Sequence, residues 1–405
     1  MSKQFLFDVL GLAEKHCGSE FTRKLLEIRS ERERILNNVW RKEPLPEDLS
    51  TYQKELILRD IDFDTIVHQS AKFLDKDDYH KLLFNIATIA IKYGEFTRGK
   101  EILLDLQKTT DRKNLALIAE IYRKLGKIDF YTNNFNSAHK YFDKSLKLYT
   151  KIEDNAGILS LKNVIGALLV EEGKYYEGEI RFIQVKKLAH EYKLYDLVAN
   201  ANMNLGNIYI IRGIYDDAIG CYKETLKVGN KDDKEMLTNL YLNFAICYKF
   251  KKEYKIALNY LEKAFDLIKE TNNRYKKSLL YLTKAEIECI NGNLNTATAL
   301  VTSAFAISAE TGDRLSAAEA YKILGMINRE SKKYDIALSY FENSKRIYSN
   351  PFYIAETLVE MAELYLATDD KSMAKKILGW AIKHYKKIDA KMRLEKLREK
   401  YSNVL

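Results

Sequence analysis

One short phrase returns about every 40 residues and constrains the fold of this chain more than any other feature. Its cleanest copy, Leu-Gly-x-x-Tyr-x-x-x-Gly-x-Tyr-x-x-Ala, runs from Leu205 to Ala218. A fixed period of this kind predicts a stack of like units, which offers a long surface for binding. Eight copies, aligned on the first small residue, follow at spacings of 39, 40, 40, 39, 40, 40 and 37 residues: Ala87, Gly126, Gly166, Gly206, Ala245, Ala285, Gly325 and Ala362.

Two further positions keep their character from copy to copy. Small side chains at two places let antiparallel helices approach closely, because the distance between helix axes follows side-chain size at the crossing. We therefore predict a helix–turn–helix in every copy, with the second helix beginning nine residues after the first small residue. The second small residue recurs twelve positions after the first, at Gly99, Ala138, Gly178, Ala218, Ala257, Ala297, Ala337 and Ala374. The ninth position holds Phe96, Phe135, Tyr175, Tyr215, Tyr254, Leu294, Tyr334 and, in the last copy, Lys371.

Composition favours an all-α protein. The 405 residues include only 3 prolines and are 46% hydrophobic, so helices are seldom interrupted and have apolar surface to bury. The sequence contains no run of 18 apolar residues, which predicts that the chain neither spans nor partners a membrane. The 4 scattered cysteines indicate a reduced, cytoplasmic protein.

With its paired small residues, its tyrosine and its turn glycine, the repeated phrase resembles the tetratricopeptide repeat family over about three quarters of the chain. The usual period of that family is about 34 residues. The longer period here is similar to that of spindle-orientation adaptors, kinesin light chain and bacterial quorum-peptide sensors. The resemblance implies a right-handed α-solenoid of about eight helix pairs, in which the first helix of each pair lines a concave face.

The repeat divides the chain into three segments. We expect an N-terminal helical region over 1–75, eight repeats over 79–388 and a basic capping helix over 389–405. In the first segment, a helix is predicted from about Glu20 to Trp40. A break at Glu43–Pro46 follows it, and Ser50 is suited to cap the next helix.

The resemblance also implies which side chains face the groove. Asn204, Leu205, Gly206 and Asn207 look like the asparagine-containing phrase with which those relatives bind a peptide backbone. An asparagine amide both donates and accepts hydrogen bonds, so it suits a backbone group of either kind. The alternative is that these asparagines are simply tolerated on an exposed helix surface. The candidate peptide-binding residues are Asn163, Asn200, Met203, Asn204, Asn207, Asn239, Asn243 and Lys249.

No motif for catalysis, cofactor binding or metal binding is present. The sequence has no glycine-rich phosphate loop, no His-Glu-x-x-His and no Cys-x-x-Cys, and its 6 histidines are dispersed. Residues 1–80 carry 13 Lys and Arg against 16 Asp and Glu, whereas residues 371–405 carry 11 against 3. The acidic N-terminal region shows no helix-turn-helix phrase, which disfavours DNA binding. We therefore expect no enzyme, no cofactor and no metal.

These observations favour a non-enzymatic protein-interaction module that holds a peptide or a partner helix in a concave groove. The rival hypothesis is a peptide-responsive bacterial regulator, in which the repeats sense a small peptide and control the N-terminal helical region. Protein or peptide is the expected partner in both cases. The sequence leaves the partner's identity and the oligomeric state open.

Overall fold

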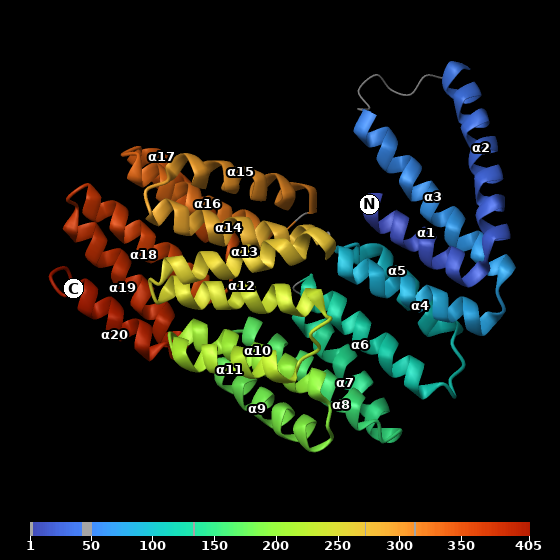
Figure 1. Cartoon of the computed structure of the whole chain (residues 1–405), viewed down its shortest axis with the longest axis horizontal. Coiled ribbons are helices and arrows are strands. Elements are labelled where there is room, and N and C mark those ends of the chain that lie inside the picture. The colour runs from blue at the N-terminus through green and yellow to red at the C-terminus, as the bar shows by residue number, and fades with distance from the viewer. Residues whose placement is uncertain (1–2, 43–50, 133, 272, 312) are drawn as a thin grey trace. The chain divides into compact units, whose positions relative to one another are not determined.

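The protein is all-α in a computed structural model that describes residues 3–42, 51–132, 134–271, 273–311 and 313–405 (Figure 1). Contacts group the chain into two compact parts, which we call the N-terminal part, residues 1–161, and the C-terminal part, residues 162–405. The predicted break at Glu43–Pro46 and the predicted cap at Ser50 lie outside the described residues.

The chain begins with three helices that come before the repeats: α1 (Lys3–Cys17), α2 (Ser19–Lys42) and α3 (Thr51–Phe73). Helix α2 corresponds to the helix predicted from Glu20 to Trp40. Phe5 and Phe63 are buried and stacked, with ring centroids 5.6 Å apart. The Tyr93 hydroxyl donates a hydrogen bond of 2.6 Å to Asp8, which ties α1 to the first repeat.

Sixteen helices of the described chain form eight consecutive pairs, which we number as repeats 1 to 8, and one further helix follows them. The paired helices are α4 (Lys76–Tyr93) with α5 (Phe96–Thr109), α6 (Leu115–Tyr131) with α7 (Phe135–Lys151), α8 (Asn155–Glu171) with α9 (Tyr175–Glu191), α10 (Tyr195–Arg212) with α11 (Tyr215–Val228), α12 (Lys234–Phe250) with α13 (Tyr254–Thr271), α14 (Arg274–Ile290) with α15 (Leu294–Thr311), α16 (Arg314–Glu330) with α17 (Tyr334–Ile347), and α18 (Pro351–Ala367) with α19 (Lys371–Lys387). The last helix is α20 (Lys391–Lys400).

The predicted register of the repeat is confirmed in detail. All eight first small residues lie in the first helix of their pair, all eight second small residues lie in the second helix, and all sixteen are buried. The first small residue of each repeat serves as its marker. The residue nine positions after this marker is the first residue of the second helix in every repeat, including Lys371 in repeat 8.

Each small residue of the first helix is matched to the side chain sixteen positions later. Where the small residue is glycine, an aromatic ring lies over it: a Cβ added to Gly126 or Gly325 would lie 2.5 Å from the ring of Phe142 or Phe341. Gly166 stands in the same relation to Phe182, and Gly206 to Tyr222. Where the small residue is alanine, the matching residue is aliphatic: Leu103, Leu261, Val301 and Leu378. The smaller residue of the first helix is therefore paired with the larger residue of the second, which keeps the helix crossing filled.

In seven of the eight pairs, the turn places its central residue in the left-handed backbone region. Glycine takes this position in four repeats, for example Gly213 at φ 84°. In three repeats a residue with a side chain takes it instead: Lys252, Lys332 and Asp369, at φ 63°, 60° and 60°. Such residues are strained there, because their Cβ approaches the backbone. Repeat packing, rather than local preference, holds these turns in place.

The fold class is confirmed as all-α, with helices packed pairwise as a tetratricopeptide-like solenoid after an N-terminal helical region. Among the described helices, none combines the length and the apolarity that a bilayer crossing requires. Within the same described ranges, no group of three or more His, Cys, Asp or Glu side chains is arranged to hold a metal ion.

Candidate peptide-binding site

The predicted asparagines come together on the first helices of repeats 3 to 5. The Asn204 amide donates a hydrogen bond of 3.3 Å to the Oδ1 atom of Asn163, one repeat earlier. The Asn243 amide donates one of 3.0 Å to Asn207, whose Oδ1 atom also accepts 2.7 Å from the Tyr222 hydroxyl. These amides therefore join neighbouring repeats, and the spacing of one repeat brings them together.

The other predicted asparagines differ in exposure. Asn200 and Asn207 are exposed, whereas Asn239 is half-buried. The Oδ1 atom of Asn239 is buried without a hydrogen-bond partner among the described residues. A hydrogen bond from an N–H group of a ligand would satisfy this buried acceptor and would therefore favour binding. We call the six asparagines 163, 200, 204, 207, 239 and 243 the asparagine face. Half-buried Met203 lies among them in sequence.

Lys249, also predicted to bind a peptide, is instead held in a buried ion pair. Its ammonium group lies 2.6 Å from Glu286 of the next repeat and 4.6 Å from the centre of the Phe250 ring. Lys322 lies 3.8 Å from the same carboxylate and 2.6 Å from Glu319. We call Lys249, Glu286, Glu319 and Lys322 the buried charge network. A peptide contact by Lys249 stays a prediction, and its partner in the free chain is Glu286.

Electrostatics explains how these charges tolerate burial. Burial alone raises the pKa of Glu286, but the ammonium groups of Lys249 and Lys322 outweigh it and hold the pKa at about 2. Burial lowers the pKa of Lys322, but Glu286 and Glu319 outweigh this and raise it above its ordinary value. Glu286 and Lys322 are therefore both charged at neutral pH.

A second recurrent contact joins the two helices of some repeats. A tyrosine near the end of the second helix donates to a glutamate near the start of the first: Tyr348 to Glu319 at 2.7 Å, and Tyr385 to Glu356. Repeat 2 has the same arrangement, with Tyr149 and Glu120. Sequence reasoning missed this contact, although its signal was present as glutamate six residues before the marker and tyrosine twenty-three after it.

The C-terminal part also closes on itself through α20. The guanidinium of buried Arg393 donates 2.8 Å to the carbonyl of Ile211 and 3.0 Å to that of Ile210, both at the end of α10. It also forms an ion pair of 2.8 Å with Glu356. The guanidinium carbon lies 4.3 Å from the centre of the Phe250 ring. Arg393 is thus buried, although it lies on the helix that the sequence predicts as a basic cap.

A second contact spans the same part of the chain. The Tyr175 hydroxyl, at the start of α9, donates 2.8 Å to Asn350, the residue that caps α18. Both side chains are buried. Helices α9 and α10 of the C-terminal part therefore contact the start of α18 and helix α20 directly.

Comparison with known proteins supports the repeat assignment. Residues 197–270, which lie in α10 to α13, match the family described as Tetratricopeptide repeat. A solved structure of a Rap protein complexed with competence and sporulation factor is similar, with a TM-score of 0.60 and 14% identity, covering 85% of this chain and 95% of that one. The Rap conjugation gene regulator of the plasmid pLS20, in complex with the Phr* peptide, gives 0.56 and 14%, covering 96% and 97%.

A third similar structure is that of aspartyl phosphate phosphatase F from Bacillus subtilis, with a TM-score of 0.52 and 14% identity, covering 87% of this chain and 96% of that one. At these identities the likeness concerns the fold. The repeat register, the helix pairs and the family match agree: residues 197–270 match the tetratricopeptide repeat family, and the chain has a tetratricopeptide-like fold.

Proposed function

We propose that the chain is a peptide-responsive regulator, in which the C-terminal part binds a short peptide through its asparagine face. The half-exposed asparagine amides of neighbouring repeats carry this proposal. Their partners in the free chain are mostly each other, so a peptide backbone would exchange one amide hydrogen bond for another at little desolvation penalty. The N-terminal helical region, residues 1–75, is then the element that the peptide controls.

Two further observations support a sensor over a rigid scaffold. Arg393 and Tyr175 join early and late repeats of the C-terminal part by a few polar contacts, which a bound peptide could reinforce or release. Two proteins of this fold, the Rap protein and the Rap conjugation gene regulator, were solved with competence and sporulation factor and with the Phr* peptide. A module that merely holds a partner helix needs no such contacts.

Binding is tested with a library of short synthetic peptides screened by fluorescence polarisation against the full chain. Replacing Asn204 and Asn243 together by alanine should weaken the affinity of a selected peptide by about 10-fold or more, since two amide hydrogen bonds are lost. Asn259→Ala, at an exposed position of α13, is the matched control and should leave the affinity unchanged. Unchanged affinity in the double variant, with helical content intact, would remove the asparagine face from the proposal.

Regulation is tested separately by small-angle scattering with and without the selected peptide. A sensor changes its dimensions when the peptide binds, whereas a scaffold keeps them. A peptide that binds through Asn204 and Asn243 without any change in dimensions would support the interaction module and overturn the regulator.

The absence of enzymatic activity stays a prediction. One protein of the same fold is an aspartyl phosphate phosphatase, so the chain should be assayed directly with acetyl phosphate as an acyl phosphate probe. We expect no hydrolysis above the rate in buffer.

A further inference from the structure

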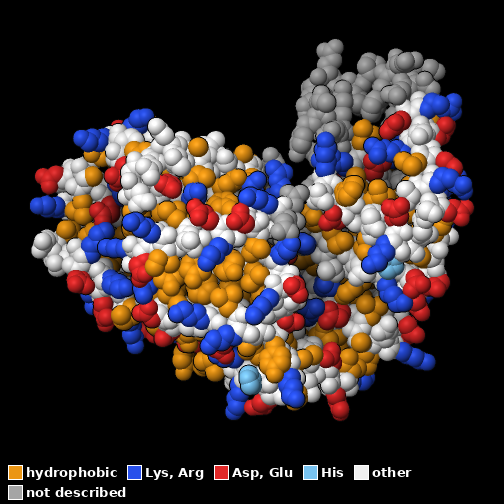
Figure 2. Space-filling view, viewed as in Figure 1, with side chains coloured by type: hydrophobic (Ala, Val, Ile, Leu, Met, Phe, Trp, Pro, Cys, Tyr) orange, Lys and Arg blue, Asp and Glu red, His pale blue; other side chains and the backbone are white. Residues whose placement is uncertain are grey.

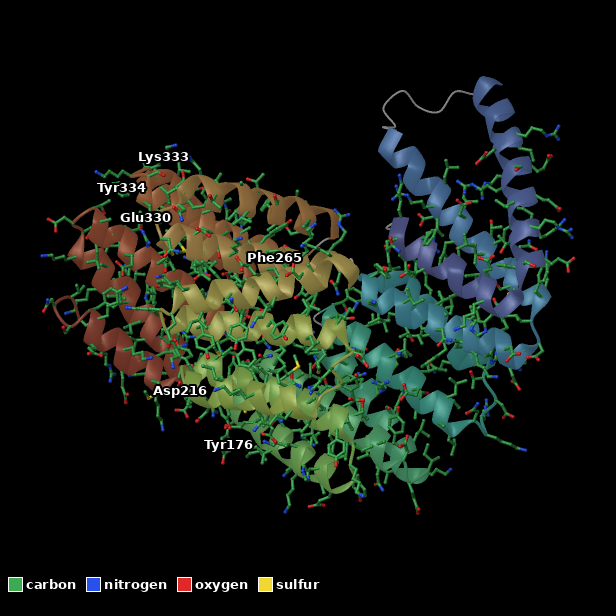
Figure 3. All side chains as sticks on the ribbon, in the orientation of Figure 1. Tyr176, Asp216, Phe265, Glu330, Lys333 and Tyr334 are labelled. Carbon is green, nitrogen blue, oxygen red and sulfur yellow. The ribbon has the colours of Figure 1, made fainter. Side chains whose placement is uncertain are left out.

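The second helix of repeat 3 carries an apolar stripe on its outward face. Tyr176, Ile180 and Ile183 of α9 are 69%, 38% and 48% exposed. The buried face of the same helix is formed by other residues, among them Phe182 and Val185. At 100° per residue the two sets point in nearly opposite directions, so the stripe is not part of the repeat core. In Figure 3 the labelled Tyr176 side chain extends away from the helix pair.

The other repeats show that this stripe is exceptional. The same three outward positions are Asp216, Gly220 and Lys223 in repeat 4, and Lys255, Asn259 and Glu262 in repeat 5. Repeats 2, 7 and 8 have polar residues or glycine at all three. Of the eighteen large exposed apolar side chains in the described chain, five lie between residues 176 and 195. Figure 2 shows apolar side chains reaching the surface over α9. An apolar patch confined to one repeat marks an interaction surface.

We infer that this surface joins two copies of the chain, with α9 of one copy antiparallel to α9 of the other. Tyr176, Ile180, Ile183 and Lys187 are separated by four, three and four residues, the spacing with which two helices pack along a seam. With a two-fold axis between Ile180 and Ile183, Ile180 of one copy packs on Ile183 of the other, and the reverse. The same axis places Lys187 of each copy against the ring of Tyr176 of the other.

The seam is self-complementary, which identifies a second copy as the partner. A two-fold interface requires that one patch matches itself, and here the apolar centre meets an apolar centre while an aromatic end meets a cationic end. Tyr192 and Tyr195, both about half exposed, continue the surface beyond the end of α9. They would lie near the α8–α9 turn of the other copy. The contact is small for a specific interface, so the dimer is reversible and depends on concentration.

Sedimentation velocity of the full chain at several concentrations tests the dimer. We expect a monomer–dimer equilibrium, and replacing both Ile180 and Ile183 by glutamate should raise its dissociation constant by roughly 100-fold or more. Asn259→Glu, at the equivalent outward position of repeat 5, should leave the equilibrium unchanged. A wild-type chain that stays monomeric at all concentrations would overturn the inference, as would a dimer that the isoleucine variant does not weaken.

Disulfide trapping tests the orientation independently of stability. A chain with Ile180→Cys and Ile183→Cys should form a covalent dimer on mild oxidation, because the antiparallel arrangement brings position 180 of one copy to position 183 of the other. The wild-type chain, whose four cysteines are free, gives the background, and Asn259→Cys is the matched control. A peptide that binds the asparagine face should still bind the Ile180→Glu, Ile183→Glu variant, so this test and that of the proposed function fail separately.

Discussion

The asparagine face and the buried charge network lie at similar positions of successive repeats but differ in charge and in burial. Both lie on first helices of the C-terminal part, at positions that the family geometry assigns to the inner surface. The first consists of neutral amides that are exposed or half-buried and bond mainly to one another. The second consists of full charges, of which Lys249, Glu286 and Lys322 are buried.

The difference shows how one scaffold supports two kinds of inner surface. A neutral amide can leave its partner at little penalty, because water or a ligand replaces the bond. A buried charge cannot leave its partner without a large desolvation penalty. We therefore expect the asparagine face of repeats 3 to 5 to adapt to a ligand, and the buried charge network, which runs from Lys249 of repeat 5 to Lys322 of repeat 7, to remain as it is.

The largest effect is expected from Glu286→Gln. This change leaves the ammonium groups of Lys249 and Lys322 buried without their shared carboxylate, and should lower the free energy of unfolding by about 3–5 kcal/mol. Urea unfolding followed by circular dichroism measures it. Asn204→Ala should cost less than about 1 kcal/mol, and similar losses in the two variants would break the comparison. The double variant Glu286→Gln, Lys249→Met should recover part of the loss.

Lowering the pH should weaken the buried charge network but leave the asparagine face unchanged, without any mutation. Because the folded pKa of Glu286, about 2, lies below its ordinary value of 4.5, its stabilisation is present above pH 4.5 and is lost as the pH falls towards 2. The asparagines do not titrate. Hydrogen exchange between these pH values should therefore show α12, α14 and α16 losing protection, with much smaller changes in Glu286→Gln, which has already lost the charge.

Arg393→Ala is expected to have the next largest effect, about 2–4 kcal/mol, since the Glu356 carboxylate loses its buried ion pair and two carbonyl groups of α10 each lose a hydrogen bond. Arg393→Lys should not restore stability, because an ammonium group cannot make the same set of planar contacts. Protection of the amides in α20 should fall in both variants. An Arg393→Lys chain as stable as the wild type would show that charge alone is sufficient.

Adding a methyl group at the helix crossing tests whether the two surfaces share one scaffold. Gly166→Ala in repeat 3 and Gly325→Ala in repeat 7 would each bring a Cβ within 2.6 Å or less of a phenylalanine ring. Each should cost about 1–3 kcal/mol by overpacking. Trimming the ring in the same chain, with Phe182→Leu or Phe341→Leu, should restore much of the loss. If Gly166→Ala and Gly325→Ala lowered the free energy of unfolding by different amounts, the helix packing of repeats 3 and 7 would also differ.

The smallest effect is expected at the turns. Lys332→Gly in repeat 7 removes a Cβ from the left-handed region and should stabilise the chain by up to about 1 kcal/mol. The reverse change in repeat 4, Gly213→Lys, should destabilise it by a similar or larger amount, since Gly213 also packs against Arg393. Thermal melts of both variants give the comparison.

Sequence reasoning predicted what a single repeat determines. The small residues, the start of each second helix and the turn positions depend on contacts within a helix pair, and these recur eight times at nearly constant spacing. The hydrogen bonds between asparagines were not predicted, although Asn207 and Asn243 are separated by about one repeat and were both expected on the same face.

The contacts that join different positions of different repeats were not predictable in this way. Lys249 lies four residues after the first small residue of repeat 5, whereas Glu286 lies one residue after that of repeat 6. Because the two occupy different positions of the repeat, the register does not predict that they pair. Arg393 reaches α10 only because small rotations between successive repeats add up. The available signal was an arginine between Met392 and Leu394 on an otherwise charged helix, and nothing in that local pattern points to α10.

The bonds from Tyr175 to Asn350 and from Arg393 to Ile211 link residues 175 and 182 positions apart. A linear array of repeats is stabilised almost entirely by its nearest neighbours, and it can lose a terminal repeat without affecting distant ones. In the C-terminal part, where repeats 3 and 4 contact the start of α18 and α20, the last helix is not independent of the earlier ones. Deleting α20 should therefore loosen α10, ten helices earlier, and the C-terminal part should fold more slowly and more cooperatively than an open solenoid of equal length.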